Sequence, residues 1–322
     1  MDKVKKLSDT QKSITKKQHY LPKAYLRFFA HQERKTQKIY TYYCKEKIVR
    51  YVSIDDICHR PFLYEQKYQS LTESTEYILA PNKIENGFID VEGEYVTLVN
   101  TLIQGVRENN IIILNDNEIG KIANFMSSFS FRHPIIIHVI NSVSKINFRE
   151  NFSDLEELQK LFPDVHESFF EAVFAQDSLS LYLKVFTYAL AKIIENSQLV
   201  VLKSFSSSFI TSDIPVVNIY GVSDNVEYDL FGFPISSDLF LAFVDTDIKL
   251  QTVITVNNEI VNKINSYQFG KRTRYIFSQN KNIIDILESA KKVVVEKDNN
   301  ETPSYNKEAK KLYDKIMSQY NY

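Results

Sequence analysis

Through the middle of the chain, apolar residues recur at steps of three and four, the spacing that places them along one face of a helix. The first two predicted helices begin at an Asn that is followed three residues later by Glu, which is the spacing of a capping box. A third pair with this spacing is Ser153 with Glu156. The helices expected from these patterns run from Asn82 to Leu102, from Asn115 to Pro134, where proline should kink or end the helix, and over residues 168–196.

The segments on either side of this helical middle are short and rich in β-branched and aromatic residues, as strands are. In the first part of the chain, residues 39–43 and 48–52 flank Lys45 and Glu46 and predict a hairpin. In the last part, strands are expected at 199–202, 208–211, 216–220, 239–244 and 274–277, with helices at 257–267 and 283–292.

This order of elements predicts an α+β fold in one large domain over residues 18–296. A helical middle, about 82–196, is expected to pack against a β part that unites segments from both ends. Residues 1–17 are expected to form a loose arm, and residues 297–322 a C-terminal part whose basic amphipathic helix carries Leu312 and Ile316 on one side.

Composition narrows the classes of function. The net charge is −1, so the chain lacks the basic field of most proteins that bind duplex nucleic acid, and any such contact must be local. Neither Gly-rich phosphate loop occurs. The two cysteines and the histidines form no zinc-ligand array. No stretch approaches the roughly 18 apolar residues of a spanning helix and no signal peptide is evident, so the expected location is the cytoplasm, with no membrane partner.

Two glutamates border the buried face of the first predicted helix. Glu85 and Glu92 are seven residues apart, so only about 20° separates them around the helix axis. They could bind a divalent cation or act as acid and base. They could equally be structural, since capping by Asn82 explains Glu85 and Glu92 could be an ordinary boundary residue.

Other polar residues stand in apolar surroundings. Arg132 lies at the edge of the second helix's apolar face, where its guanidinium would pair with a glutamate or hold a phosphate. Asp213 ends a strand before a proline turn, where a carboxylate caps a loop or serves a site. His19 precedes an aromatic cluster and is either a packing residue or a base. Asn262 and Asn265 share a helix face and suggest buried hydrogen bonding, or substrate contacts if a site forms.

Short motifs in a fixed order give the chain its resemblance to the bacterial family catalogued as domain of unknown function 4238. They cover roughly residues 18–280: HYLPKAYLRFF at 19–29, Glu85 with Glu92, Arg132 before Pro134, FITSDIPVV at 209–217, Pro234-Ile235-Ser236, Asn262 with Asn265, and RYIFS at 274–278. The family has a small residue where this chain has His133. The resemblance implies that His19, Glu85, Glu92, Arg132, Asp213 and Asn262 converge in space, and it carries no assigned function.

Two hypotheses follow. In the first, the protein is a nuclease-like or other phosphoester-directed hydrolase acting on RNA or DNA, with a toxic effector in anti-phage defence as one form of it. Glu85, Glu92 and Asp213 would hold Mg²⁺ or Mn²⁺, His19 would be the general base and Arg132 would bind phosphate. In the second, it is a non-catalytic binding or regulatory module, and the same polar set is a buried structural network. A protein partner or an oligomer is compatible with both.

Overall fold

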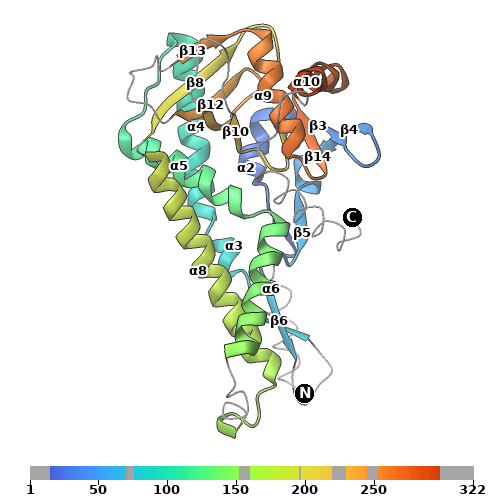
Figure 1. Ribbon diagram of the computed structural model, residues 1–322, viewed down its shortest axis with the longest axis vertical. Helices are drawn as coiled ribbons and strands as arrows, with labels where there is room; N and C mark the ends of the chain where they lie inside the picture. Colours follow the sequence, from blue (N-terminus) through green and yellow to red (C-terminus); the bar gives the residue numbers. More distant parts are fainter. Residues whose placement is uncertain are drawn as a thin grey trace.

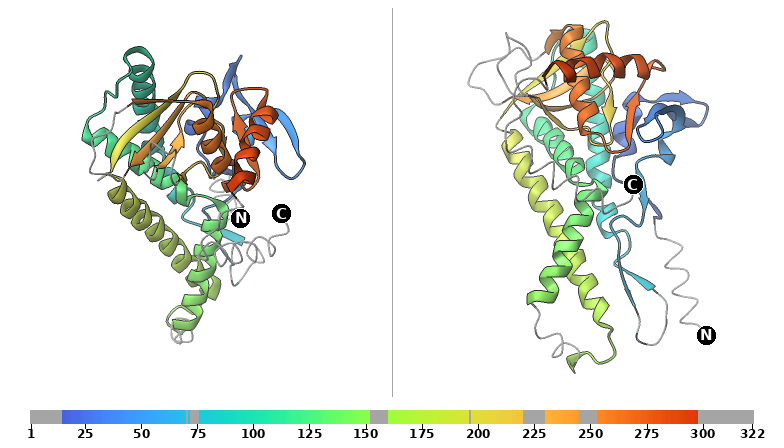
Figure 2. Two further views of the ribbon diagram at one scale, coloured as in Figure 1. Left: turned by 45° about the horizontal axis from the view of Figure 1, so that its top comes forward. Right: turned by 45° about the vertical axis from the view of Figure 1, so that its right-hand side comes forward.

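The computed structural model describes residues 15–69, 71, 76–151, 160–195, 197–219, 230–244 and 253–297. The molecule is elongated (Figure 1): the larger sheets, α9 and α10 lie at one end, and α6, α8 and the β6 strand extend away from them. Both views in Figure 2 show α6 and α8 running side by side in this extension. Within the described residues, no helix combines the length and apolar character needed to cross a membrane.

The last part of the chain forms a five-stranded sheet in the order β10-β11-β12-β8-β13, antiparallel except for β13 beside β8. Side chains alternate along β12, so Leu239, Leu241 and Phe243 join the main core while Phe240, Ala242 and Val244 join a second core beneath α9. Both faces of this sheet are therefore covered. The bounds are Gln198–Ser204 (β8), Val217–Ile219 (β10), Leu230–Pro234 (β11), Leu239–Val244 (β12), Val253–Val256 (β13) and Asn258–Lys271 (α9).

A second sheet joins the two ends of the chain. β14 (Tyr275–Ser278) lies between β3 (Thr36–Tyr43) and β9 (Thr211–Ser212). The predicted hairpin is present, since β3 pairs with β4 (Ile48–Ser53) in antiparallel register. This sheet confirms the prediction that the β part unites segments from both ends. Its remaining strand is β2 (His31–Glu33), and α10 (Ile283–Lys297) packs nearby through Ile283 and Leu287.

The helical middle contains α3 (Lys83–Asn86), α4 (Ile89–Asn109), α5 (Asp116–Phe131), α6 (Pro134–Asn151) and α8 (Glu167–Glu195). The capping box of Asn115 with Glu118 is formed, as predicted. The one expected at Asn82 and Glu85 is wrong: Asn82 has a left-handed backbone, and its side chain accepts from the amide of Thr15 at 2.9 Å instead. The pair at Ser153 lies outside the described residues.

Proline at position 134 both ends one helix and begins the next, because its fixed φ and missing amide hydrogen suit a first helical position. The helix α6 that follows was not expected from the sequence. Neither were β11, β13 or the small hairpin of β6 (Gln66–Gln69) and β7 (Glu76–Leu79). The strands are short, and α6 opens with an apolar run that fits a strand as well as a helix.

The N-terminal segment is fixed in place by a two-stranded ladder. β1 (Lys17–His19) pairs with β5 (His59–Pro61), which sets His19 directly opposite His59. The chain then turns into α2 (Lys23–Leu26) and the 3-10 turn η1 (Arg27–Phe29), and Tyr25, Leu26 and Phe29 are completely buried in the main core. A second 3-10 turn, η2 (Ile54–Asp56), precedes β5. Most of the predicted arm, and the predicted tail helix at 305–320, lie outside the described residues.

Candidate functional site

The candidate residues form two groups, one around Arg132 and one around His133. Two pairs of consecutive residues contribute one side chain to each group. His19 and Tyr20 follow each other at the end of β1, and Arg132 and His133 join α5 to α6. Neighbouring side chains in each dipeptide point in different directions. Arg132 meets the backbone of His19, whereas the rings of Tyr20 and His133 pack edge to face with centroids 5.4 Å apart.

Arg132 forms the centre of the first group, and its side chain is only 1% exposed. Its guanidinium donates to Glu92 Oε1 at 2.7 Å, to the carbonyl of His19 at 2.9 Å and to Tyr64 Oη at 3.0 Å. Its flat face lies 3.9 Å from the ring centroid of Phe88. A buried charge with a counter-ion and several hydrogen bonds is stable only while that set stays complete. Arg132 therefore ties β1, α4 and the segment at Tyr64 together.

Glu85 and His19 border this network with one buried polar atom each that has no hydrogen-bond partner among the described residues: Glu85 Oε2 and His19 Nε2. Burial raises the pKa of Glu85 to about 7, an effect that Arg132 opposes and Glu92 reinforces. Burial, with Lys23 and His59 next in effect, lowers the pKa of His19 to about 4. At neutral pH, His19 is thus uncharged and Glu85 is only partly ionised.

Replacing Glu85 by Gln should stabilise the protein at pH 8. The pKa of Glu85 is about 7 in the fold and near the usual glutamate value when unfolded, so the loss of stability builds up as the pH rises from about 4.5 to 7 and is fully present above pH 7. After discounting for partial exposure, the gain at pH 8 should be about 1–2 kcal/mol. Denaturant melts of wild type and variant from pH 5 to 8 would measure it; a difference that does not shrink as the pH falls would contradict the assignment.

Asp213 belongs to the second group and is only 3% exposed. Its carboxylate accepts from the amide of Thr273 at 2.8 Å, the amide of Arg274 at 2.8 Å and the hydroxyl of Thr273 at 2.5 Å. Burial raises the pKa of this carboxyl, although the hydrogen bonds from Thr273 and Arg274 act in the opposite direction. Asp213 thus fastens the end of β9 to the start of β14.

The metal site expected from Glu85, Glu92 and Asp213 is not assembled. The described residues contain no group of three or more His, Cys, Asp or Glu side chains placed to hold a metal ion. The physical reason is that the carboxylates are committed elsewhere: Glu92 to Arg132, and both oxygens of Asp213 to Thr273 and Arg274. Arg132 is therefore in direct contact with Glu92 and with the backbone of His19. The carboxylate of Asp213 is bonded instead to Thr273 and Arg274.

A hydrogen-bonded chain leads from Asp213 to His133. The Thr273 hydroxyl donates to Asp213, so it accepts from His133 Nε2 at 3.2 Å, and Nδ1 accepts a long bond of 3.4 Å from the amide of Ile135. This pattern assigns the proton of the neutral imidazole to Nε2. Burial, then Arg60 and Arg274, lower the pKa of His133 to about 4, so the ring is neutral at physiological pH.

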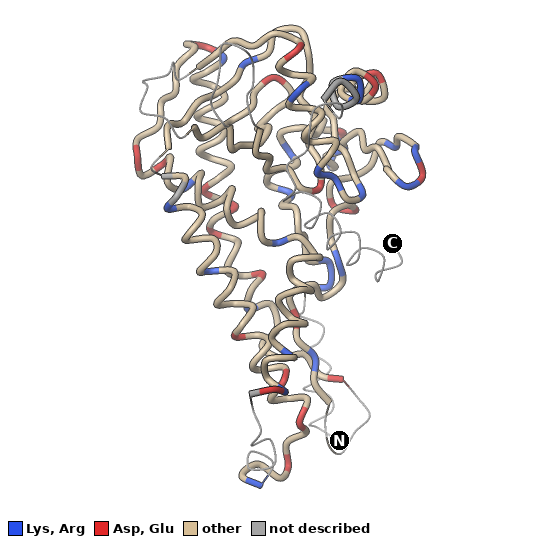
Figure 3. Tube along the Cα trace, viewed as in Figure 1, with Lys and Arg blue, Asp and Glu red and all other residues tan. Residues whose placement is uncertain are grey.

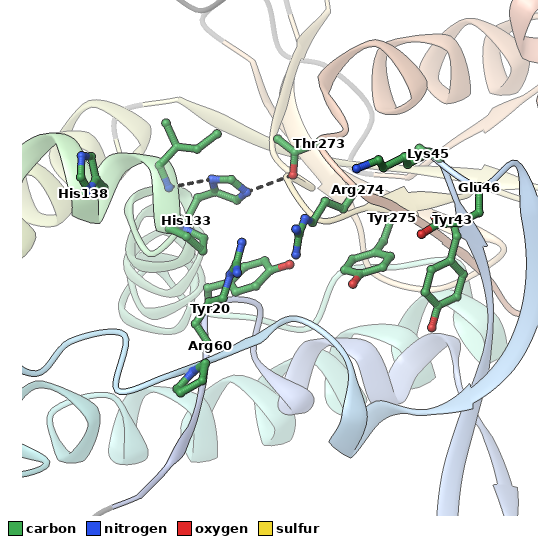
Figure 4. A pocket seen from close by; sticks show the side chains of 14 residues that line it. Tyr20, Tyr43, Lys45, Glu46, Arg60, His133, His138, Thr273, Arg274 and Tyr275 are labelled. Atoms are coloured by element: carbon green, nitrogen blue, oxygen red, sulfur yellow. Dashed lines mark hydrogen bonds between the residues drawn. The ribbon is translucent and has the colours of Figure 1, made fainter. Parts of the chain in front are cut away.

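His133 faces a cavity of about 850 Å³ (Figure 4). Among the described residues, its polar lining is mainly basic and aromatic, with Glu46 as the one carboxylate. Basic and acidic residues are interspersed over the rest of the described trace (Figure 3), so this positive charge is a local feature. The lining side chains come from five separate regions: Tyr20; Tyr43 to Glu46; Arg60 and Pro61; His133 to Ile135 with His138; and Thr273 to Tyr275.

Residues 17–282 match the family described as a protein of unknown function, DUF4238. The chain belongs to this family. Comparison with curated proteins and with solved structures finds no match. The span matched to the DUF4238 family contains the whole Arg132 network and every residue that lines the cavity, so both features lie within the family's common domain.

Asn265, expected to contact substrate, is fully buried and uses its amide elsewhere. Its Oδ1 accepts from the amide of Ile210 at 3.0 Å and its Nδ2 donates to the carbonyl of Ser208 at 2.9 Å. Asn265 therefore holds the segment before β9 and does not face the cavity. Asn262 is half-buried on the same helix, and it does not line the cavity either.

Several lining residues were overlooked in the sequence. Arg274 and Tyr275 begin the RYIFS motif but were not assigned to a site. Arg60 lies far from them in the chain, and no spacing links it to that motif. His133 departs from the family pattern and sits in an apolar stripe, which favours a packing role. The signal in the sequence was two consecutive polar residues, Arg132 and His133, at the end of a helix. Because the chain turns there, Arg132 enters the buried network and His133 faces the cavity.

Proposed function

We propose that this protein binds a phosphate-bearing ligand in the cavity at His133. The observation that carries the proposal is the lining: Lys45, Arg60 and Arg274 surround the cavity with a single carboxylate, Glu46. Arginine and lysine donate to phosphate oxygens, and a volume of about 850 Å³ suits a small organic ligand.

Several contacts also fix the positively charged groups of the cavity in position before a ligand binds. Asp213 fixes the backbone on either side of Thr273 and Arg274, so the cationic side chain of Arg274 starts from a rigid strand end. Burial, together with Arg60 and Arg274, keeps His133 neutral, so these two arginines supply the positive charge that an anion would meet beside the ring. Pro134 and Ile135 bring the beginning of α6 into the wall, where the helix dipole favours negative charge.

Replacing Arg60 by Gln should weaken the binding of pyrophosphate at least about tenfold, the loss expected for one charged hydrogen bond. Isothermal titration of the full chain at low salt would measure it. The matched control is Lys121→Gln, which removes an exposed cation that pairs with Glu94 and should leave binding unchanged. Equal affinities for wild type and the Arg60 variant, or no binding of pyrophosphate to wild type, would refute the proposal.

A second candidate function is hydrolysis of a bound phosphoester, which includes nuclease action on RNA or DNA. The observation that favours it is the chain from Asp213 through Thr273 to His133, which orients a neutral imidazole toward the cavity. Water would attack phosphorus and the bond to the leaving oxygen would break. His133 Nδ1 would release its long bond from the Ile135 amide and take the proton of the water, and the leaving oxygen would take one from solvent. A non-catalytic module would bind the same ligand without turnover.

Replacing His133 by Gln separates these two cases. Gln can still donate to Thr273 but offers no imidazole base, so turnover should fall by about a hundredfold or more, with pyrophosphate affinity changed less than about threefold. Release of product from RNA, DNA and a chromogenic phosphodiester, with and without Mg²⁺ or Mn²⁺, would be followed. A toxic effector should also slow growth when expressed in bacterial cells, and this variant should not. Equal turnover in both proteins would exclude His133 as the base.

A further inference from the structure

We infer that the ligand of this cavity is a nucleoside phosphate unit, bound with its phosphate beside His133 and its base against Tyr43 and Tyr275. The inference rests on the proposed phosphate-binding function and adds the class and orientation of the ligand. The cavity has two chemically distinct ends (Figure 4): His133, Thr273 and Arg60 lie toward one end, Tyr275, Tyr43, Lys45 and Glu46 toward the other, and Arg274 lies between them.

The first end suits a phosphate. Arg60 and Arg274 reach it from different strands, β5 and the start of β14, and both lower the pKa of His133 through their charge, so both cations lie near that ring. The wall between them includes Pro134 and Ile135 at the N-terminus of the long helix α6. Two cations beside the positive end of a helix dipole favour a phosphate, and the arginines supply the hydrogen bonds to its oxygens.

The other end suits a planar base. Tyr43 and Tyr275 are opposite residues on paired strands, and their rings meet edge to face with centroids 5.2 Å apart. Both residues are half-buried and line the cavity. The guanidinium of Arg50 lies over the Tyr43 ring, 5.0 Å from its centroid, so a base would use the edge or the opposite face of that ring. Stacking of a base on such side chains is worth about tenfold in affinity or more. Lys45 and Glu46 lie beside the rings and offer a donor and an acceptor to the edge of the base.

The limited size of the cavity and the weak overall charge favour a single nucleotide unit over a duplex. In a duplex the bases are stacked on each other and cannot reach the tyrosine rings without flipping out. A protein that grips a long polyanion also needs a basic surface well beyond one cavity, and the net charge here is −1. The same nucleotide unit could come from a free nucleotide or from the end of a single strand.

The test is isothermal titration of the full chain with a nucleoside 5′-diphosphate, pyrophosphate, the bare nucleoside, a short single-stranded oligonucleotide with a 5′-phosphate, and the same oligonucleotide as a blunt duplex. The diphosphate should bind at least about tenfold tighter than pyrophosphate and than the nucleoside. If the single-stranded end binds tighter than the diphosphate, the natural source is a strand; the reverse order indicates a free nucleotide. A duplex that binds as tightly as the single strand would overturn the inference.

Two variants assign the ends of the cavity. Tyr43→Leu keeps a residue that suits a strand, and it should reduce the preference for diphosphate over pyrophosphate to about one, with pyrophosphate affinity unchanged. Tyr275→Leu should do the same by an independent route, and thermal melts confirm that each variant is folded. If wild type binds pyrophosphate and the diphosphate equally, the inference is wrong while the proposed phosphate binding stands. If wild type binds neither, both are wrong.

Discussion

Replacing Glu92 by Ala is expected to lower the free energy of unfolding by about 3 kcal/mol, because it leaves the guanidinium of Arg132 buried without its counter-ion. Arg132 is only 1% exposed, and Glu92 is its ion-pair partner at 2.7 Å. The remaining acceptors, the His19 carbonyl and the Tyr64 hydroxyl, carry no charge. Glu85 should respond as well: once its like-charged neighbour is removed, its pKa should fall and it should become the carboxylate nearest to Arg132.

The matched control is Glu94→Ala in the same helix. Glu94 pairs with Lys121 at 3.0 Å, but both side chains are about half exposed at 52% and 41%. Such a pair contributes less than about 1 kcal/mol, and both substitutions change helix propensity equally. Urea melts at pH 7.5 would measure the difference between the two variants. Equal midpoints would show that Arg132 does not depend on Glu92, and a folded Glu92 variant that has lost only activity would restore a catalytic role to this residue.

Asp213→Asn is expected to cost about 2–4 kcal/mol and to abolish ligand binding at the cavity. The carboxylate accepts from two backbone amides and one hydroxyl. An Asn side chain can accept at only one of its two ends, so its NH₂ group would face the donor hydrogen of Thr273 or Arg274. The strand end that carries Arg274 into the cavity should then shift, and affinity should fall with it.

Melting curves and pyrophosphate titrations of Asp213→Asn, compared with Asp55→Asn, would test this. Asp55 pairs with Lys23 on the surface, where both side chains are about half exposed, at 55% and 47%, and its replacement should cost less than about 1 kcal/mol. A stable Asp213 variant that binds ligand normally would show that the carboxylate does not position Thr273 and Arg274.

Much of the fold could be predicted because the spacing of apolar residues indicates directly which segments are helices and which are strands. The helices at α4, α5 and α8 follow from stripes at steps of three and four, and the β3–β4 hairpin from two alternating runs. The helix α6 was missed because its first turn is a run of Pro and Ile, which reads equally well as a strand. The capping box predicted at Asn82 is absent because the side chain of Asn82 accepts a hydrogen bond from the amide of Thr15, which is distant in the chain.

The candidate site was predicted only in part, for a physical reason. Carboxylates and an arginine near a buried face are equally compatible with a metal site and with a closed ion-pair network, and the choice depends on which donors lie opposite. In the fold, Tyr64 and the His19 carbonyl complete the shell of Arg132. The basic cavity could not be anticipated, because Arg60, in β5 beside β1, and Arg274, just before β14 beside β3, come together only in the folded chain.

The most direct measurement is a crystal structure of the full chain grown with a nucleoside 5′-diphosphate. The account predicts phosphate density between Arg60, Arg274 and the first turn of α6, with the base against Tyr43 and Tyr275 and the Arg132–Glu92 pair unchanged. Phosphate bound instead at Arg132, with Glu92 released from it, or ordered ligand at Glu85 and Glu92 with the His133 cavity empty, would contradict it.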